Sequence, residues 1–205
     1  MLRSAAVPQT WCHMHDHFAM FAAYNRWANE RLYEAAAKLP EADYRADRGA
    51  FFGSLHGTLN HLLVTDRIWM HRFTGSGPAP TRLDEVLHDD LVSLGAARRE
   101  EDERIIVWVE SLSEGAIAGT ITYRPISRPI DITQPLASVL AHLFNHQTHH
   151  RGQAHALLTI AGGKGAAPSL DLAYFQRETG MGLACADEPD RPPSPTSHAS
   201  PALPS

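Results

Sequence analysis

The feature that most constrains the fold is a repeat of apolar residues at steps of three and four along four long segments. In the segment 15–38 the apolar stripe consists of Phe21, Tyr24, Ala28, Leu32, Ala35 and Leu39. This spacing places apolar side chains on one face of an α-helix. Comparable patterns cover 51–73, 83–112 and the stretch from Pro135 to Gly162. Because such faces are best buried against one another, we predict an all-α chain that folds as an antiparallel four-helix bundle.

Prolines and glycines mark where these helices end. Pro40 follows the first segment, and a proline has no amide hydrogen for another helical turn. Pro135 suits the first position of the fourth helix, and the glycine pair 162–163 suits its C-terminal end. The stretch 120–132 is rich in β-branched residues and prolines, which predicts a short β-hairpin or an extended crossover between the third and fourth helices. A short helix near 170–178 is expected to close one end of the bundle.

The two ends of the chain differ in composition from the middle. Residues 1–13 carry no helical pattern, and residues 181–205 are rich in Pro, Ser, Ala and Asp. A segment of that composition cannot bury enough apolar surface to offset the entropy lost on ordering. We therefore predict one folded unit at 14–180, between a disordered lead-in and a disordered Pro/Ser-rich tail.

Composition argues against several classes of protein. The formal net charge is -5 and no cluster of Lys or Arg is evident, which argues against a nucleic-acid binder that neutralises phosphates. No apolar run approaches the roughly 18 residues of a membrane-spanning helix, and the N-terminal apolar stretch is too short for a signal peptide. Cys12 and Cys185 lie outside the helical segments and form no ligand pair. We expect a cytoplasmic protein without nucleic-acid or membrane partners.

Histidine is unusually abundant, with 13 in the chain. On a helical wheel of the fourth segment, His146 and His150 fall in the same arc as three apolar residues, Val139, Leu143 and Leu157. A separation of four residues stacks the two imidazoles on neighbouring turns, and with this spacing one helix offers two ligands to one metal ion. The alternative is a pair of core histidines that hydrogen-bond to water or to polar neighbours.

The second helical segment supplies a third histidine, His61, which lies beside Ile68 on the helical wheel. Its nearest wheel neighbours are small or hydroxyl residues, namely Ser54, Gly57, Thr58 and Thr65. Small side chains around an imidazole leave room for an ion and a ligand. Metal sites in bundles are built from inward side chains on facing helices. If the second and fourth helices face each other, His61, His146 and His150 form a three-histidine site.

Five other histidines lie on the same two helical segments, namely His56, His71, His142, His149 and His155. His142 and His149 flank the predicted pair, and His142 either is a further ligand, supports the ligands or lines the pocket. His56 and His155 point away from the predicted site on their wheels, and we expect both to be solvated.

Three strings of the sequence resemble the DinB family, the damage-inducible bacterial proteins of the DinB/YfiT-like superfamily, which are distinct from the DNA polymerase that shares the name. The strings are YNRWANERLY at 24–33, SLHGTLNHLLVTDRIW at 54–69 and AHLFNHQTHHRGQ at 141–153. The resemblance extends over about 15–178 and does not cover the two ends of the chain.

This resemblance implies a four-helix bundle, often paired as a homodimer. It also implies a divalent metal ion, nickel or zinc, bound by one histidine of the second helix and a His-x-x-x-His pair of the fourth. Matched residue by residue, the implied ligands are His61, His146 and His150, the same three that the helical wheels bring together. Three imidazoles by themselves suit zinc, nickel and copper alike. Ordinary histidine pKa values predict that metal binding weakens below about pH 6.

Three neutral ligands leave an open coordination position, which is typical of catalytic rather than structural metal sites. Members of the wider superfamily include thiol-dependent transferases and isomerases that use bacillithiol or mycothiol. The resemblance therefore implies a metal-dependent transferase or hydrolase acting on a small molecule, with a low-molecular-weight thiol as a candidate cofactor. One alternative is a non-catalytic, stress-induced metal- or ligand-binding protein. Another is a bundle whose histidines are accidental, which predicts no bound metal.

Overall fold

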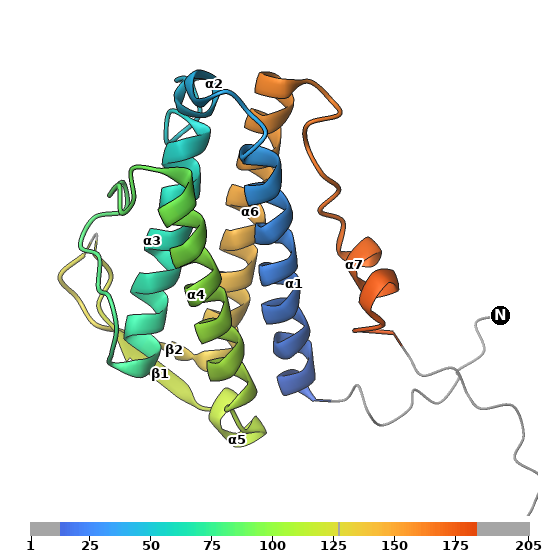
Figure 1. The fold of residues 1–205 in the computed structure, drawn as a ribbon. Coiled ribbons are helices and arrows are strands. Elements are labelled where there is room, and N and C mark those ends of the chain that lie inside the picture. Colours follow the sequence, from blue (N-terminus) through green and yellow to red (C-terminus); the bar gives the residue numbers. More distant parts are fainter. Residues whose placement is uncertain (1–12, 127, 184–205) are drawn as a thin grey trace, which may run out of the picture.

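The computed structural model describes residues 13–126 and 128–183. Four long helices pack side by side as one bundle (Figure 1): α1 (Met14–Ala36), α3 (Leu55–Thr74), α4 (Leu91–Glu110) and α6 (Leu136–Gly162). The predicted all-α four-helix bundle is therefore confirmed. No helix within the described ranges combines the length and the apolar character that crossing a membrane requires. The predicted lead-in and tail, with both cysteines, lie outside these ranges apart from His13 and 181–183.

The remaining elements are short: α2 (Glu41–Arg45), α5 (Glu114–Ile117), β1 (Thr120–Tyr123), β2 (Ile132–Pro135) and α7 (Leu172–Thr179). The strands β1 and β2 pair antiparallel, with Thr120 opposite Pro135, which confirms the predicted hairpin before the fourth long helix. The helix α7 matches the range of the short helix predicted near 170–178. It packs against the side of α1 (Figure 1), where Phe175 contacts Tyr24 and Trp27, so the prediction that it closes one end of the bundle was wrong. The helices α2 and α5 were not predicted, because one or two turns are too short to show an apolar repeat.

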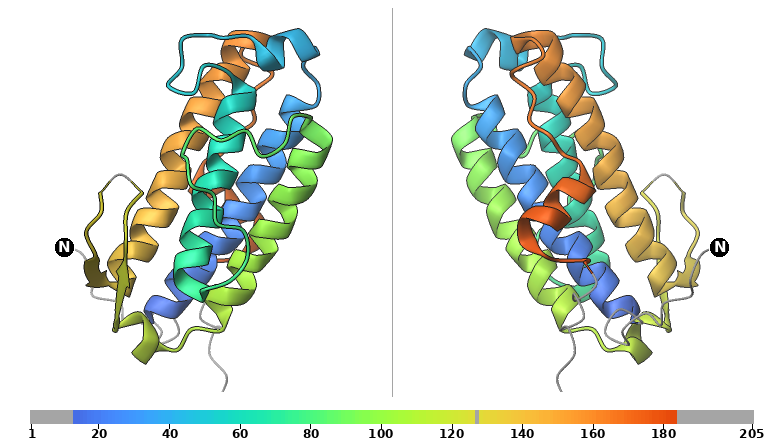
Figure 2. Two further views of the ribbon diagram at one scale, coloured as in Figure 1. Left: turned by 90° about the vertical axis from the view of Figure 1, so that its left-hand side faces the viewer. Right: turned by 90° about the vertical axis from the view of Figure 1, so that its right-hand side faces the viewer.

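The directions of the long helices are mixed. The helices α1 and α4 are antiparallel, and so are α3 and α6, whereas α3 and α4 run in the same direction. Asp66 contacts Arg98, and further along both helices Thr74 accepts a hydrogen bond from Arg104. The connection 75–90 makes the parallel arrangement possible, since it carries the chain back along the outside of α3 (Figure 2). Antiparallel packing, which the sequence predicts for the whole bundle, thus applies to two of its helix pairs.

The third long helix is shorter than its predicted range of 83–112, because α4 begins at Leu91. Asp90 caps it: the side chain accepts a hydrogen bond from the amide of Ser93 at 2.8 Å. Val86, an apolar residue inside the predicted range 83–112, is 55% exposed. The prediction was wrong here because the apolar residues before Asp90 belong to the connection and not to the helix.

This connection is fastened to α3 by polar contacts. The Asn60 side-chain oxygen accepts hydrogen bonds from the amides of Leu87 and His88, at 2.8 and 3.1 Å. His56 is also buried beneath it, with its Nε2 3.1 Å from the His88 carbonyl oxygen. The prediction that His56 is solvated was therefore wrong, since a helical wheel contains no information about a loop that folds over the helix.

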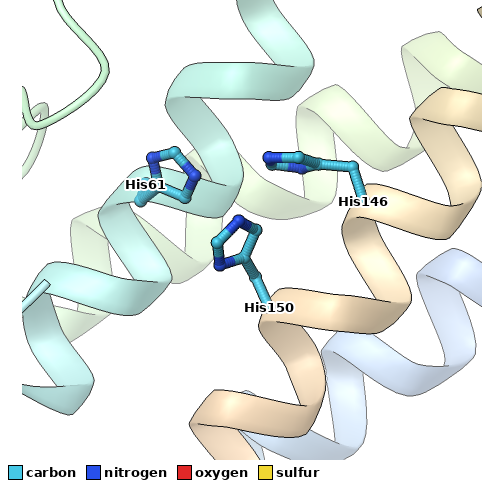
Figure 3. Close-up of side chains that lie close together, drawn as sticks. All are labelled: His61, His146 and His150. Carbon is cyan, nitrogen blue, oxygen red and sulfur yellow. The ribbon is translucent and has the colours of Figure 1, made fainter. Parts of the chain in front are cut away.

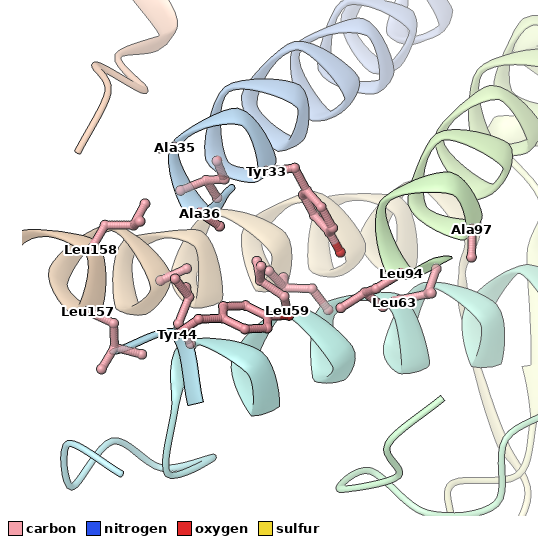
Figure 4. Close-up of a cluster of buried hydrophobic side chains, with 14 residues drawn as sticks. Tyr33, Ala35, Ala36, Tyr44, Leu59, Leu63, Leu94, Ala97, Leu157 and Leu158 are labelled. Carbon is pink, nitrogen blue, oxygen red and sulfur yellow. The ribbon is translucent and has the colours of Figure 1, made fainter. Parts of the chain in front are cut away.

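The core is divided along the bundle axis. At the end near α2, leucines and alanines of all four long helices form one apolar cluster (Figure 4), among them Leu32, Leu59, Leu63, Leu94 and Leu158. At the hairpin end, a second cluster contains aromatic and aliphatic side chains, among them Phe18, Met70, Ile105, Val139 and Leu140.

Buried polar side chains from all four long helices form an additional network in the core. Arg98 on α4 contacts Asp66 on α3 at 2.7 Å and Asp102 at 3.0 Å, and each of the three side chains is at most 2% exposed. Asn29 on α1 donates to Asp102 at 2.9 Å, and Gln147 on α6 donates to Asp66. Because Gln147 follows His146 directly, this network anchors the turn of α6 that carries the candidate site.

Candidate metal site

The three predicted histidines lie together between α3 and α6. The His61 ring centre is 5.4 Å from that of His146 and 4.5 Å from that of His150, and the two rings on α6 are 4.3 Å apart. Figure 3 shows the three rings turned toward one another, one from α3 and two from successive turns of α6. One nitrogen from each ring lies within 4.8 Å of the other two, so the group can hold a metal ion.

Hydrogen bonds fix how two of these rings are presented. The Nδ1 of His61 is 2.7 Å from the carbonyl oxygen of Leu83. Since a carbonyl oxygen only accepts, Nδ1 carries the proton and Nε2 keeps its lone pair. The Nδ1 of His150 is 2.8 Å from the side-chain oxygen of Gln153, which leaves its Nε2 free in the same way. Such outer hydrogen bonds are the usual means of orienting metal-binding imidazoles.

The residues present fit a metal ion. The Nε2 of His61 is buried and has no hydrogen-bond partner among the described residues, and the same holds for Nδ1 of His146. A buried polar atom without a partner costs free energy of roughly 1–3 kcal/mol. A cation held between the rings would give the His61 nitrogen a partner. The donor set, three imidazole nitrogens, is one that zinc, nickel and copper all accept.

The electrostatics of the site keep the imidazoles neutral. Burial lowers the pKa of His61 to about 4, with the Leu83 carbonyl acting in the opposite direction. Burial, with His150 and His61 adding to it, lowers the pKa of His146 to about 3. Burial also lowers the pKa of His150. Near neutral pH all three rings are therefore unprotonated, which is the state that binds a metal ion.

One wall of the site comes from a residue that the sequence analysis missed. The Phe52 ring stacks on the His61 ring with their centres 3.7 Å apart and their planes 20° apart. A Cβ at Gly57 would come within 2.2 Å of the Phe52 carbonyl oxygen, so glycine is needed there for this close approach. Gly57, one of the small residues beside His61 on the helical wheel, thus allows the chain at Phe52 to approach α3. In the predicted helix 51–73, Phe52 lies opposite His61 on the helical wheel. In the structure Phe52 instead precedes the cap residue Ser54, outside the helix, and its ring stacks on His61.

The carbonyl of Leu83 and the amide of Gln153 were also missed. Leu83 lies in the connection 75–90, at the first residue of the range 83–112 where the sequence predicts a helix. In a helix its carbonyl would bond to the main chain and would not be available to His61. Gln153 lies three residues after His150, and that spacing is a signal from which the contact could have been predicted.

A cavity of about 330 Å³ adjoins the histidine group, and we call it the His146 pocket. It is lined by Thr65, Ile68, Trp69, Arg72, Leu83, Tyr123, Pro125, Ile126, His142 and His146. Of the alternatives left open for His142, the structure favours pocket lining: its ring is 5.8 Å from that of His146 and packs edge-on against Trp69. Neither His142 nor His149 belongs to the group of converging ligand atoms.

A larger cavity of about 500 Å³ lies between α1 and α4. Its lining includes Tyr33, Arg98 and Asp102 but, among the described residues, no histidine or cysteine. It is therefore separate from the three-histidine group, and the smaller cavity is the one placed for chemistry at that group.

Comparison with known proteins agrees with this geometry. The model of the DinB family matches residues 14–181. This chain belongs to the DinB family. It is 26% identical over 168 residues to the protein named "Protein DinB" of Bacillus subtilis (strain 168), an alignment that covers 76% of this chain and 92% of that protein. The resemblance seen in the sequence is thereby confirmed, and the matched range of this DinB-family chain contains all three converging histidines.

Proposed function

We propose that this DinB-family protein binds one divalent metal ion, zinc or nickel, through His61, His146 and His150 and uses it in a reaction on a small molecule. The observation that carries the proposal is the convergence of three neutral imidazoles on one point, where the buried Nε2 of His61 has no other partner among the described residues. A purely structural role for these histidines would leave that nitrogen unsatisfied at a cost in stability.

The ligand set favours an enzyme over a structural metal site. No carboxylate or cysteine of the described residues joins the three-histidine group, so a fourth coordination position is open to a small molecule. A divalent metal in such a site supplies Lewis acidity, which lowers the pKa of a bound water or thiol.

The side chains of the pocket indicate where a nucleophile comes from. The described lining of the His146 pocket contains no serine or cysteine, and the hydroxyl of Thr65 donates to the His61 carbonyl oxygen at 3.0 Å. Trp69 and Tyr123 form an aromatic wall whose rings meet edge-on at 4.9 Å. The described lining thus provides a partly apolar compartment without a serine or cysteine nucleophile. We propose that a low-molecular-weight thiol or water attacks the substrate, as in a transferase or a hydrolase.

The second candidate is a stress-induced protein that binds a metal or a ligand without turnover. The small volume of the pocket is compatible with either function. The homodimer that the family resemblance implies and the cytoplasmic location stay predictions, of which the first is testable by light scattering of the purified protein.

Cobalt substitution tests the open position directly. We expect the cobalt-loaded protein to change its visible absorption spectrum when 2-mercaptoethanol is added. His146→Ala should lose the cobalt spectrum, whereas His155→Ala, a half-buried histidine of the same helix, should keep it. A cobalt spectrum that no thiol perturbs would contradict the thiol-dependent mechanism. If the metal-loaded protein also shows no turnover when a thiol and an electrophile are supplied together, the result would favour the second candidate, a binding protein.

A further inference from the structure

Arg72, near the end of α3, is placed in an unusual way for a surface arginine. Its guanidinium carbon lies 4.5 Å from the centre of the Trp69 ring and 5.0 Å from the centre of the Tyr123 ring. One of its nitrogens donates to the carbonyl oxygen of Arg124 at 3.2 Å. The side chain is half-buried, held between an aromatic residue of its own helix and one of the β-hairpin.

No carboxylate in the described part of the chain neutralises this guanidinium. Within residues 13–126 and 128–183, no Asp or Glu oxygen lies within 4.0 Å of Arg72, whereas Arg67, Arg98 and Arg104 each have an acidic partner. Burial lowers the pKa of Arg72, which shows that the protein holds this charge at a cost. A guanidinium carries five N–H donors, and the main-chain contact uses one of them. The remaining donors are available to a ligand.

Arg72 and the histidine group line the same cavity. The His146 pocket has His146 in its lining, and His142 and Trp69 connect that ring to Arg72 through ring contacts of 5.8 and 5.3 Å. Among the described lining residues, Arg72 is the one with a permanent charge. A small molecule bound in this pocket of about 330 Å³ would therefore lie between the histidine group on one side and the Arg72 cation on another.

We propose that the His146 pocket is the substrate pocket and that Arg72 binds a carboxylate of a small molecule whose other end reaches the three-histidine site. This inference rests on the proposed function. The planar fork of a guanidinium matches the two oxygens of a carboxylate. A phosphate dianion fits less well, because the described lining offers no second Lys or Arg to balance its charge. Arg72 is thus a specificity residue for an acidic substrate or an acidic thiol.

Matched pairs of small thiols test this assignment by binding alone. The probes are ω-mercaptocarboxylates of increasing chain length, starting from 3-mercaptopropionate, each paired with the uncharged alcohol of equal length, such as 3-mercaptopropan-1-ol. Isothermal titration calorimetry on the zinc-loaded protein gives the dissociation constant of each. For at least one chain length, we expect the wild type to prefer the carboxylate by about tenfold or more. Arg72→Gln should remove this preference and leave binding of the alcohol unchanged, and Arg72→Lys should keep part of it.

The controls separate this proposal from the metal site itself. Arg26→Gln removes an equal charge from α1, where Arg26 pairs with Glu103, and it should retain the full preference. Zinc content and the thermal midpoint, measured on every variant, report on the metal site and on folding. The role of Arg72 would be overturned if the wild type and Arg72→Gln prefer the carboxylate thiol equally, or if the wild type shows no preference for it. A normal zinc content in the same samples would leave the metal site intact. A wild type that holds no zinc would contradict the proposed function instead.

Discussion

We expect the metal-free protein to lose stability in mild acid, because His61 is buried as a neutral imidazole. Burial lowers the pKa of His61 from 6.5 to about 4 in the folded state. In the unfolded chain the same imidazole takes up its proton near pH 6.5. Between these two pH values the unfolded state binds more protons than the folded state, so the free energy of unfolding falls as the pH falls. The contribution of the neutral His61 ring to the free energy of unfolding is fully present above about pH 6.5 and is lost as the pH falls to about 4.

The size of the effect follows from the two pKa values. They differ by about 2.5, which corresponds to about 3 kcal/mol in the free energy of unfolding for His61 alone. His61 is only 3% exposed, so solvent screening reduces this figure little. His146, with a pKa lowered to about 3, acts in the same direction.

Urea unfolding of the chelator-treated protein, followed by circular dichroism at a series of pH values, measures this loss. His61→Gln removes the titrating ring. Between pH 6.5 and 4 this variant should therefore lose about 3 kcal/mol less of its free energy of unfolding than the wild type loses. His155→Gln, which removes an imidazole elsewhere on α6, should leave the slope of the wild type unchanged. If the wild type and His61→Gln lose stability in parallel over this range, His61 is not buried as a neutral ring and the reasoning fails.

Three further predictions concern the same region. Metal affinity, measured by competition with a chelator of known pH dependence, should begin to fall only below the pH at which ordinary imidazoles take up protons, because burial lowers the pKa of His61, His146 and His150; a steep fall already near pH 6.5 would contradict the burial. Gln153→Leu removes the acceptor for His150 Nδ1 and should weaken metal binding about 10- to 100-fold in the same assay; unchanged affinity would show that this hydrogen bond does not orient the ring. Arg98→Met leaves Asp66 and Asp102 buried without their cation and should lower the free energy of unfolding in urea by about 3–5 kcal/mol; the added substitutions Asp66→Asn and Asp102→Asn should recover part of the loss, and a loss below about 1 kcal/mol would refute the network.

The three histidines could be predicted from the sequence because the chemistry depends on local spacing. His146 and His150 are four residues apart inside an apolar stripe, and a regular helix converts that spacing into a shared face. Placing His61 opposite them required only that α3 and α6 pack against each other, which they do. The long helices were predictable for the same reason.

Several of the missed features depend on contacts between segments far apart in the sequence. The start of α4 and the parallel course of α3 and α4 follow from the connection 75–90, whose apolar residues continue a helical repeat without forming a helix. The carbonyl of Leu83 reaches His61 across 22 residues, and Arg72 meets Tyr123 of the hairpin. Helical periodicity contains no information about such contacts. The pH dependence changed for the same reason: an ordinary histidine pKa predicts weaker binding below about pH 6, and burial moves the expected onset lower.

Metal analysis of untagged protein tests the central claim most directly. Inductively coupled plasma mass spectrometry should find about one divalent metal ion per chain in the wild type and in His155→Ala, and close to none in His61→Ala. Circular dichroism on each sample verifies that the variants are folded. Wild-type protein that holds no metal after incubation with zinc or nickel, or His61→Ala that holds as much as the wild type, would contradict the three-histidine site.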